Sequence, residues 1–126
     1  MKKILFISIA LLLNSATWAA QSKPEKCPSV DAIQASGFDA SAKEESGYYT
    51  VCKTSNYDTH DKWTFLIYHI KASSRDEATE KATLALQTLS GNPEPTYING
   101  HFGCHYDTKS DYYANAYNAQ PTICKH

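Results

Sequence analysis

The sequence predicts an α+β domain in which a four-stranded antiparallel sheet, in ββαββ order, carries one long helix on one face. Three observations support this fold class: a strand at Trp63–Ile70 that is apolar on both faces, an amphipathic helix directly after it, and tyrosine-rich strand-like segments before and after that unit. Two hairpins flanking one helix pack most economically as a sheet with the helix across one face. A short N-terminal helix and two disulfides complete the expected domain.

Residues 1–19 are predicted to be a signal peptide. Lys2 and Lys3 form a positive n-region, Ile4–Leu13 forms an apolar h-region, and residues 17–19 offer a cleavage site after Ala19. An apolar run of about ten residues is too short to span a bilayer as a helix. We therefore expect one domain over residues 20–126 that is secreted or periplasmic and is not embedded in a membrane.

The charge balance argues against polyanionic partners. Once the two lysines of the signal peptide are removed, the 12 basic side chains fall to ten, against 13 acidic ones. The basic residues do not form a block. We therefore do not expect nucleic acid or an anionic membrane as a partner.

The four cysteines, Cys27, Cys52, Cys104 and Cys124, all follow the predicted signal peptide. An even number in a small exported chain predicts two structural disulfides. The spacing contains no CxxC pair, which argues against a zinc knuckle and a thioredoxin-type redox site. The spacing allows three pairings and does not select one. A cysteine protease would need a reduced thiolate, such as that of Cys104, which a disulfide would remove.

The first half of the domain is predicted to begin with a short helix. Ser29 can cap this helix and Gly37 can close it. Phe38–Ser46 has no hydrophobic period and is expected to be a loop. The first strand is Tyr48–Lys53, and the polar stretch Ser55–Lys62 reverses the chain into the second strand.

The second strand, Trp63–Ile70, has apolar residues on both faces. A strict period of two places Ile67 on one face and Ile70 on the other. This pattern is typical of a central strand that is covered on both sides.

A capped helix follows the second strand. Ser74 with Glu77 three residues later forms a capping box, and a competing box starts one residue earlier. Gly91 followed by Pro93 is expected to end the helix. The buried stripe is alanine-rich and includes Ala82, so this helix can lie close to the sheet.

The last third of the chain is predicted to form the second hairpin. Tyr97–Asp107 is expected to be a third strand, interrupted at residues 99–100 and bulged at Gly103. Thr108–Asp111 forms a polar turn, and Tyr112–Ala119 is expected to be a fourth, edge-like strand.

The densest chemical cluster comprises His101, His105 and Tyr106. On a regular strand the two histidines share a face but lie about 13 Å apart, at ~3.3 Å per residue, too far to chelate one metal ion together. A ferric haem needs a tyrosine or histidine as axial ligand, so these three residues are the candidate cofactor ligands. The competing interpretations are ordinary strand histidines or a hydrolase on the 101–111 hairpin, which would require a concave pocket with perturbed titrating groups.

Nine tyrosines are the compositional feature that most needs explanation. Tyrosine can simply cover apolar area while its hydroxyl stays hydrated. Alternatively, the sheet face away from the helix carries an aromatic surface for a flat or apolar ligand, or for a protein. Packing and capping leave Tyr68 and His69 without a role. An inhibitory interaction domain would instead carry a large exposed apolar patch.

A family resemblance is carried by three segments of the chain: CPSVDAIQASG, NYDTHDKWTFLIYHIKASSRDEATEKA and FGCHY. They resemble a Legionella-type family of small exported proteins of unknown function, and some members of that family are called hemin-binding protein. The resemblance implies one exported domain with Cys27 paired to Cys104 and Cys52 to Cys124. It also suggests hemin as a ligand, although the haem attachment sequence CxxCH is absent. The sequence therefore favours a non-enzymatic secreted or periplasmic binding protein for hemin or for a host or envelope protein.

Overall fold

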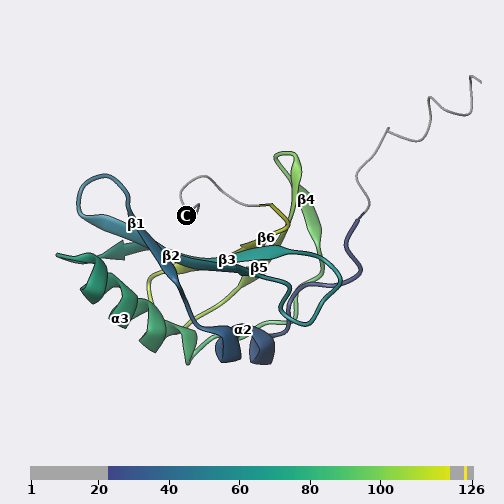
Figure 1. The fold of residues 1–126 in the computed structure, drawn as a ribbon, viewed down its shortest axis with the longest axis horizontal. Coiled ribbons are helices and arrows are strands. Elements are labelled where there is room, and N and C mark those ends of the chain that lie inside the picture. The colour runs from purple at the N-terminus through teal and green to yellow at the C-terminus, as the bar shows by residue number, and fades with distance from the viewer. Residues whose placement is uncertain (1–22, 120–123, 125–126) are drawn as a thin grey trace, which may run out of the picture.

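The computed structural model describes residues 23–119 and 124, and it contains one six-stranded antiparallel sheet with two helices on the same side of it (Figure 1). The strand order is β1-β2-β3-β6-β5-β4. We call the side of the sheet that carries the helices the inner face and the opposite side the outer face. The predicted signal peptide lies outside the described residues. The elements are α2 (Val30–Ser36), β1 (Ala40–Lys43), β2 (Tyr48–Ser55), β3 (Trp63–Lys71), α3 (Arg75–Leu86), β4 (Thr96–Ile98), β5 (His101–Tyr106) and β6 (Tyr113–Tyr117).

The predicted four-stranded ββαββ sheet is wrong, because two additional strands form its edges. Residues 40–43, expected to lie in a loop, pair with β2 as edge strand β1. The expected third strand is instead a hairpin of β4 and β5, in which Asn99 and Gly100 have φ values of 50° and 87°. Positive φ at both central residues is the signature of a type I′ turn, whose twist suits a two-residue hairpin. The expected edge strand is β6, which lies inside the sheet between β3 and β5.

Both helices begin where their capping residues predict. The Ser29 hydroxyl accepts the Ala32 N–H at the start of α2, and the Ser74 hydroxyl accepts the Glu77 N–H at the start of α3. The Glu77 carboxylate in turn accepts the Ser73 N–H at 2.7 Å. However, α3 is shorter than expected, because it ends at Leu86 and continues only as turns rather than reaching Gly91.

The main core lies between the inner face and the helices. Ala78 and Ala82 of α3 are fully buried, and such small side chains let the helix approach the sheet closely. The strands contribute large residues to the same core, with Trp63 and Phe65 fully buried. The predicted packing of an alanine stripe against the sheet is therefore present.

Strand β3 departs from a strict period of two. Val51 pairs with Ile67 and Tyr49 pairs with Ile70, so Thr50 alone lies opposite two residues of β3. Two residues against one is a β-bulge. Ile70 therefore shares the inner core with Ile67. The prediction from the sequence, that the two residues lie on opposite faces, is wrong.

The bulge expected at Gly103 is absent, because β5 keeps a regular register with both β4 and β6. Gly103 is nevertheless needed for close packing. A Cβ at this position would lie 3.2 Å from the Tyr117 ring, so the missing side chain lets that ring lie across β5.

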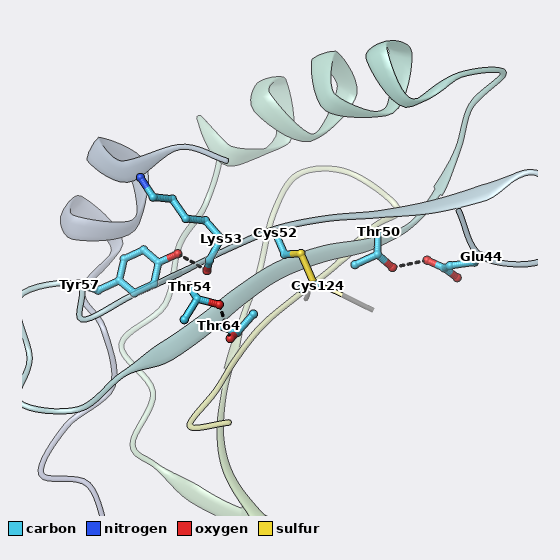
Figure 2. Close-up of a disulfide and its surroundings, with 8 residues drawn as sticks. All are labelled: Glu44, Thr50, Cys52, Lys53, Thr54, Tyr57, Thr64 and Cys124. Atoms are coloured by element: carbon cyan, nitrogen blue, oxygen red, sulfur yellow. Dashed lines mark hydrogen bonds between the residues drawn. A yellow bond between two sulfur atoms is a disulfide. The ribbon is translucent and has the colours of Figure 1, made fainter. Parts of the chain in front are cut away.

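Two disulfides hold the fold from opposite faces. Cys27 is bonded to Cys104 in the inner core, and Cys52 is bonded to Cys124 in a smaller outer cluster with Leu66 (Figure 2). This pairing is the one that the family resemblance implies. The two bonds are consistent with a periplasmic or extracellular protein. Among the residues described, no helix has the length and apolar character that a membrane crossing requires.

Candidate functional site

Four rings from three strands meet on the outer face, near one end of the sheet. The rings of Tyr48 and His69 stack in parallel, with centroids 4.1 Å apart. The Tyr113 ring lies 5.9 Å from His69 and 5.4 Å from Tyr68. We call Tyr48, Tyr68, His69 and Tyr113 the outer-face aromatic cluster. Tyr113 remains 51% exposed, so the cluster is open to solvent.

The bulge in β3 explains how His69 reaches this cluster. His69 has φ of 66°, and of the five non-glycine residues with positive φ in the described ranges it is the one that lies within a strand. Backbone strain of this kind costs about 1–3 kcal/mol and persists where surrounding structure enforces it. The bulge places Tyr68 and His69 side by side on the outer face.

A carboxylate holds the bulge in place. Glu44 Oε2 accepts hydrogen bonds from the Thr50 hydroxyl at 2.6 Å and from the His69 N–H at 3.1 Å. Thr50 is the residue opposite the bulge and is only 3% exposed. Figure 2 shows Glu44 and Thr50 facing each other on the side of the sheet away from α3. Glu44 therefore positions His69 through its backbone.

A polar network extends from the aromatic cluster across β6 and β5. Asn115 Nδ2 donates to the hydroxyls of Tyr68 at 3.0 Å and Tyr117 at 2.8 Å. Its Oδ1 must then accept from His105, whose Nδ1 lies 2.8 Å away, so this imidazole nitrogen carries a proton. His105 Nε2 lies 3.5 Å from a carboxylate oxygen of Asp107.

Burial raises the pKa of Tyr68 to about 12, and the neighbouring Tyr117 hydroxyl adds to the rise. Because an ionised phenol would be poorly solvated there, Tyr68 stays protonated at neutral pH. It is therefore a neutral hydrogen-bonding group within the network.

The three predicted cofactor ligands lie on different faces. His101 and His105 are exposed, and His105 belongs to the outer-face network. Tyr106 is 1% exposed in the inner core, where its hydroxyl donates to the Pro28 carbonyl and its pKa is raised by burial. The structure thus does not bring the three residues together. Within the described residues, no group of three or more His, Cys, Asp and Glu side chains could hold a metal ion.

Sequence reasoning singled out Tyr68 and His69 and allowed for an aromatic surface on this face, but it did not group the four residues of the aromatic cluster. Tyr48, His69 and Tyr113 come from three separate segments, and only the pairing of β3 with both β2 and β6 unites them. One signal was present in the sequence. Ile67 and Ile70 are both apolar and three residues apart, a spacing that a strand of period two can place on one face only with a bulge.

The 101–111 hairpin lacks the enclosure that a hydrolase site would need. His105 is 67% exposed, and both of its ring nitrogens already face a partner. Three shallow hollows are lined by described residues. One is formed by the N-terminal lead-in with the β2–β3 loop and one by α2 with α3. The third lies between α3 and the tip of the hairpin at Lys109 and Ser110, and its lining includes no histidine and no carboxylate. The site geometry is that of an open face rather than a catalytic pocket.

The fold and the site together define a disulfide-stapled α+β domain with one open aromatic and polar sheet face. Residues 26–124 match the family described as "Domain of unknown function (DUF4949)", and the chain belongs to this family. The family description names no ligand and no source organism. No curated protein and no solved structure matches the chain.

Proposed function

We propose that this protein is a non-enzymatic binding module of the periplasm or the extracellular space, and that its ligand lies on the outer face of the sheet. The observation that carries the proposal is the outer-face aromatic cluster, four contiguous rings of which Tyr113 is half exposed. Aromatic rings with polar tips supply large contact area at low conformational cost. The export signal predicted for residues 1–19 and the two disulfides support the compartment.

The strain at His69 supports a functional role for the same face. A strained residue inside a strand weakens the fold unless something else selects it. Here Glu44 and Thr50 enforce the conformation, and the result is an imidazole presented between two tyrosine rings. The bulge brings Ile70 into the inner core, but the imidazole of His69 lies outside that core, so we attribute the choice of a ring at this position to ligand contact.

Hemin is the first ligand to test, because the sequence resembles proteins that carry that name. Of the predicted iron ligands, His101 and His105 are exposed and Tyr106 is buried, so the proposal for hemin rests on the two histidines. We expect a saturable Soret shift when the purified protein is titrated with hemin. Replacing each histidine by alanine would identify the iron ligand through the loss of that shift.

A pair of matched tyrosine variants tests the location of the site. Tyr113→Ala removes an exposed ring of the cluster, whereas Tyr97→Ala removes an exposed ring of β4 that contacts Phe102 and lies outside the cluster. Hemin binding should weaken only in Tyr113→Ala. Absence of a Soret shift at micromolar protein would remove hemin as the ligand, and equal weakening in both variants would remove the outer face as its site.

The two other candidate functions have less support. A hydrolase would need a free general base, but both nitrogens of His105 face a partner on an open surface. An inhibitory interaction domain would carry one large apolar patch. The exposed large hydrophobic residues in the described part lie instead on three different elements, namely Leu84 on α3, Tyr97 and Ile98 on β4, and Tyr113 on β6.

A further inference from the structure

The polar groups beside the aromatic cluster identify the chemistry of a ligand that could bind there. Asn115, His105 and Asp107 form a line of hydrogen-bonding side chains that begins at Tyr68, a member of the cluster. A ligand that covers both parts must present an apolar surface to the rings and many hydroxyl or amide groups to the line. Sugar rings have this character, because their C–H groups form apolar faces and their hydroxyls project from the edges.

We infer that the outer face binds a neutral saccharide chain, with a ring of the sugar stacked on Tyr113 and hydroxyls bonded to Asp107 and His69. This inference rests on the proposed function and specifies its ligand class. It is carried by the juxtaposition of an open aromatic cluster with the exposed Asp107 carboxylate and His105 imidazole, which the half-buried Asn115 amide links to the cluster.

Hydrogen-bonding capacity remains open at Asp107 in the line and at His69 in the aromatic cluster. Asp107 is 76% exposed and makes one long contact with His105, so its carboxylate can accept from sugar hydroxyls. The imidazole of His69 is held by ring contacts alone within the described residues, which leaves its nitrogens available to a ligand. A purely apolar ligand would leave these groups without partners.

The charges on this face favour a neutral ligand over an anionic one. Glu44 and Asp107 are carboxylates at the two ends of the site, and Glu44 is already committed to the bulge. Within the described residues, Lys71, which pairs with Tyr48, adds a cation to the same face. Anionic groups such as uronic acids would therefore meet net repulsion.

The shape of the site also suits a chain rather than a small enclosed ligand. The cluster and the polar line run across β2, β3, β6 and β5 of one continuous sheet. Tyr113 in the cluster is 51% exposed, and the side chain of His105 in the line is 67% exposed. An extended saccharide can follow such a surface and make several weak contacts along it.

The test uses nuclear magnetic resonance titration of the full mature chain with three neutral probes. These are tetramers to hexamers of β-linked glucose, α-linked glucose and N-acetylglucosamine. At least one probe should give saturable shifts confined to Tyr48, His69, Tyr113, Asn115 and His105. Tyr113→Ala and Asp107→Asn, both exposed positions, should weaken binding by about tenfold and by several-fold, respectively. Tyr97→Ala should bind as the parent does.

Three outcomes would overturn the inference: no saturable shift with any probe at millimolar concentration, weakening by Tyr97→Ala as large as that by Tyr113→Ala, or tighter binding of an oligogalacturonate than of every neutral probe. Failure of the inference is separable from failure of the proposed function. If hemin binding depends on Tyr113 but no saccharide binds, the outer face is a binding site and the ligand class is wrong.

Discussion

At His69 the backbone conformation and the side-chain contacts favour different residue types. A positive φ suits glycine or asparagine, and in an ordinary strand alanine is more stable than glycine by about 0.5–1 kcal/mol. At His69 the conformation is fixed by Glu44 and by the bulge, while the imidazole stacks on Tyr48. The residue type at this position is therefore explained by the ring and not by the backbone.

This conflict predicts a reversed order for two variants. His69→Gly loses the stacking but relieves the strain, whereas His69→Ala loses the stacking and keeps a Cβ at φ of 66°. We expect His69→Gly to be more stable than His69→Ala by about 1 kcal/mol, in urea unfolding followed by circular dichroism. Equal stability, or a more stable alanine variant, would show that the bulge relaxes and that His69 is not strained.

The buried tyrosines give the protein a pH-dependent stability in the alkaline range. Burial raises the pKa of Tyr57 and Tyr106 above the ordinary value, and a carboxylate at Asp39 adds to the rise at Tyr57. A group with a higher pKa in the folded state stabilises the native state fully below its unfolded pKa of about 10. That contribution is lost as the pH rises above this value.

The difference in free energy of unfolding between the parent and Tyr106→Phe should therefore become smaller as the pH rises. At pH 8 the variant lacks the hydrogen bond to the Pro28 carbonyl and should be less stable by about 1 kcal/mol. At pH 10.5 the parent has lost part of its tyrosine contribution, so the gap should shrink in urea unfolding. Tyr97→Phe, at a position that is 61% exposed, is the control and should keep a constant gap. A gap for Tyr106→Phe that does not change with pH would contradict the assignment.

Among the elements, α3 is the one whose packing depends most on residue size. Ala82 is fully buried against the sheet, whereas the neighbouring Lys81 is 40% exposed at its side chain and donates to the Lys71 carbonyl. Ala82→Gln should cost at least about 2 kcal/mol, because it inserts bulk and an unpaired amide into a closed core. Lys81→Gln should cost less than about 1 kcal/mol. Comparable losses for both in thermal or urea unfolding would mean that α3 is not held closely to the sheet.

The elements with strong local patterns were predictable, and those formed by pairing were not. β3 is apolar and α3 has a capping box, so both are specified by their own residues. The sequence Ala-Ser-Ala-Lys of β1 has little strand preference, and it becomes a strand only because β2 offers it a free edge. β5 directly precedes β6, so the internal position of β6 depends on its second neighbour, β3, which lies far from it in the sequence.

The two positive-φ positions that shape the sheet differ in how clearly the sequence marks them. Asn99-Gly100 has the composition of a type I′ turn, and it was identified as an interruption but not as the centre of a hairpin. His69 is a weaker mark, because histidine is enriched among non-glycine residues at positive φ but adopts it far less readily than glycine. The bulge follows instead from the burial of both Ile67 and Ile70, and burial is known only once the sheet is assembled.

At the scale of the whole molecule, the candidate site depends on the assembly of four strands. Tyr48, His69, Tyr113 and His105 come from β2, β3, β6 and β5. A sequence reading that groups residues by proximity along the chain collects His101, His105 and Tyr106 instead, and alternation in β5 then sends Tyr106 to the opposite face. The candidate site was therefore only partly predictable, through His105 and through the excess of tyrosines.

The two disulfides should make similar contributions to stability but different contributions to the outer face. They join residues 77 and 72 positions apart, and loops of this length give about 4–5 kcal/mol each from chain entropy. Alanine is the suitable replacement, because all four cysteines are buried and a serine hydroxyl would lack partners. Both double variants, Cys27→Ala with Cys104→Ala and Cys52→Ala with Cys124→Ala, should unfold at markedly lower urea concentration. Only the second should shift the resonances of Leu66 and Tyr117, which pack in the outer cluster with that bond. If the first variant moved these outer resonances equally, the two faces would be mechanically coupled and the outer face would not be an independent surface.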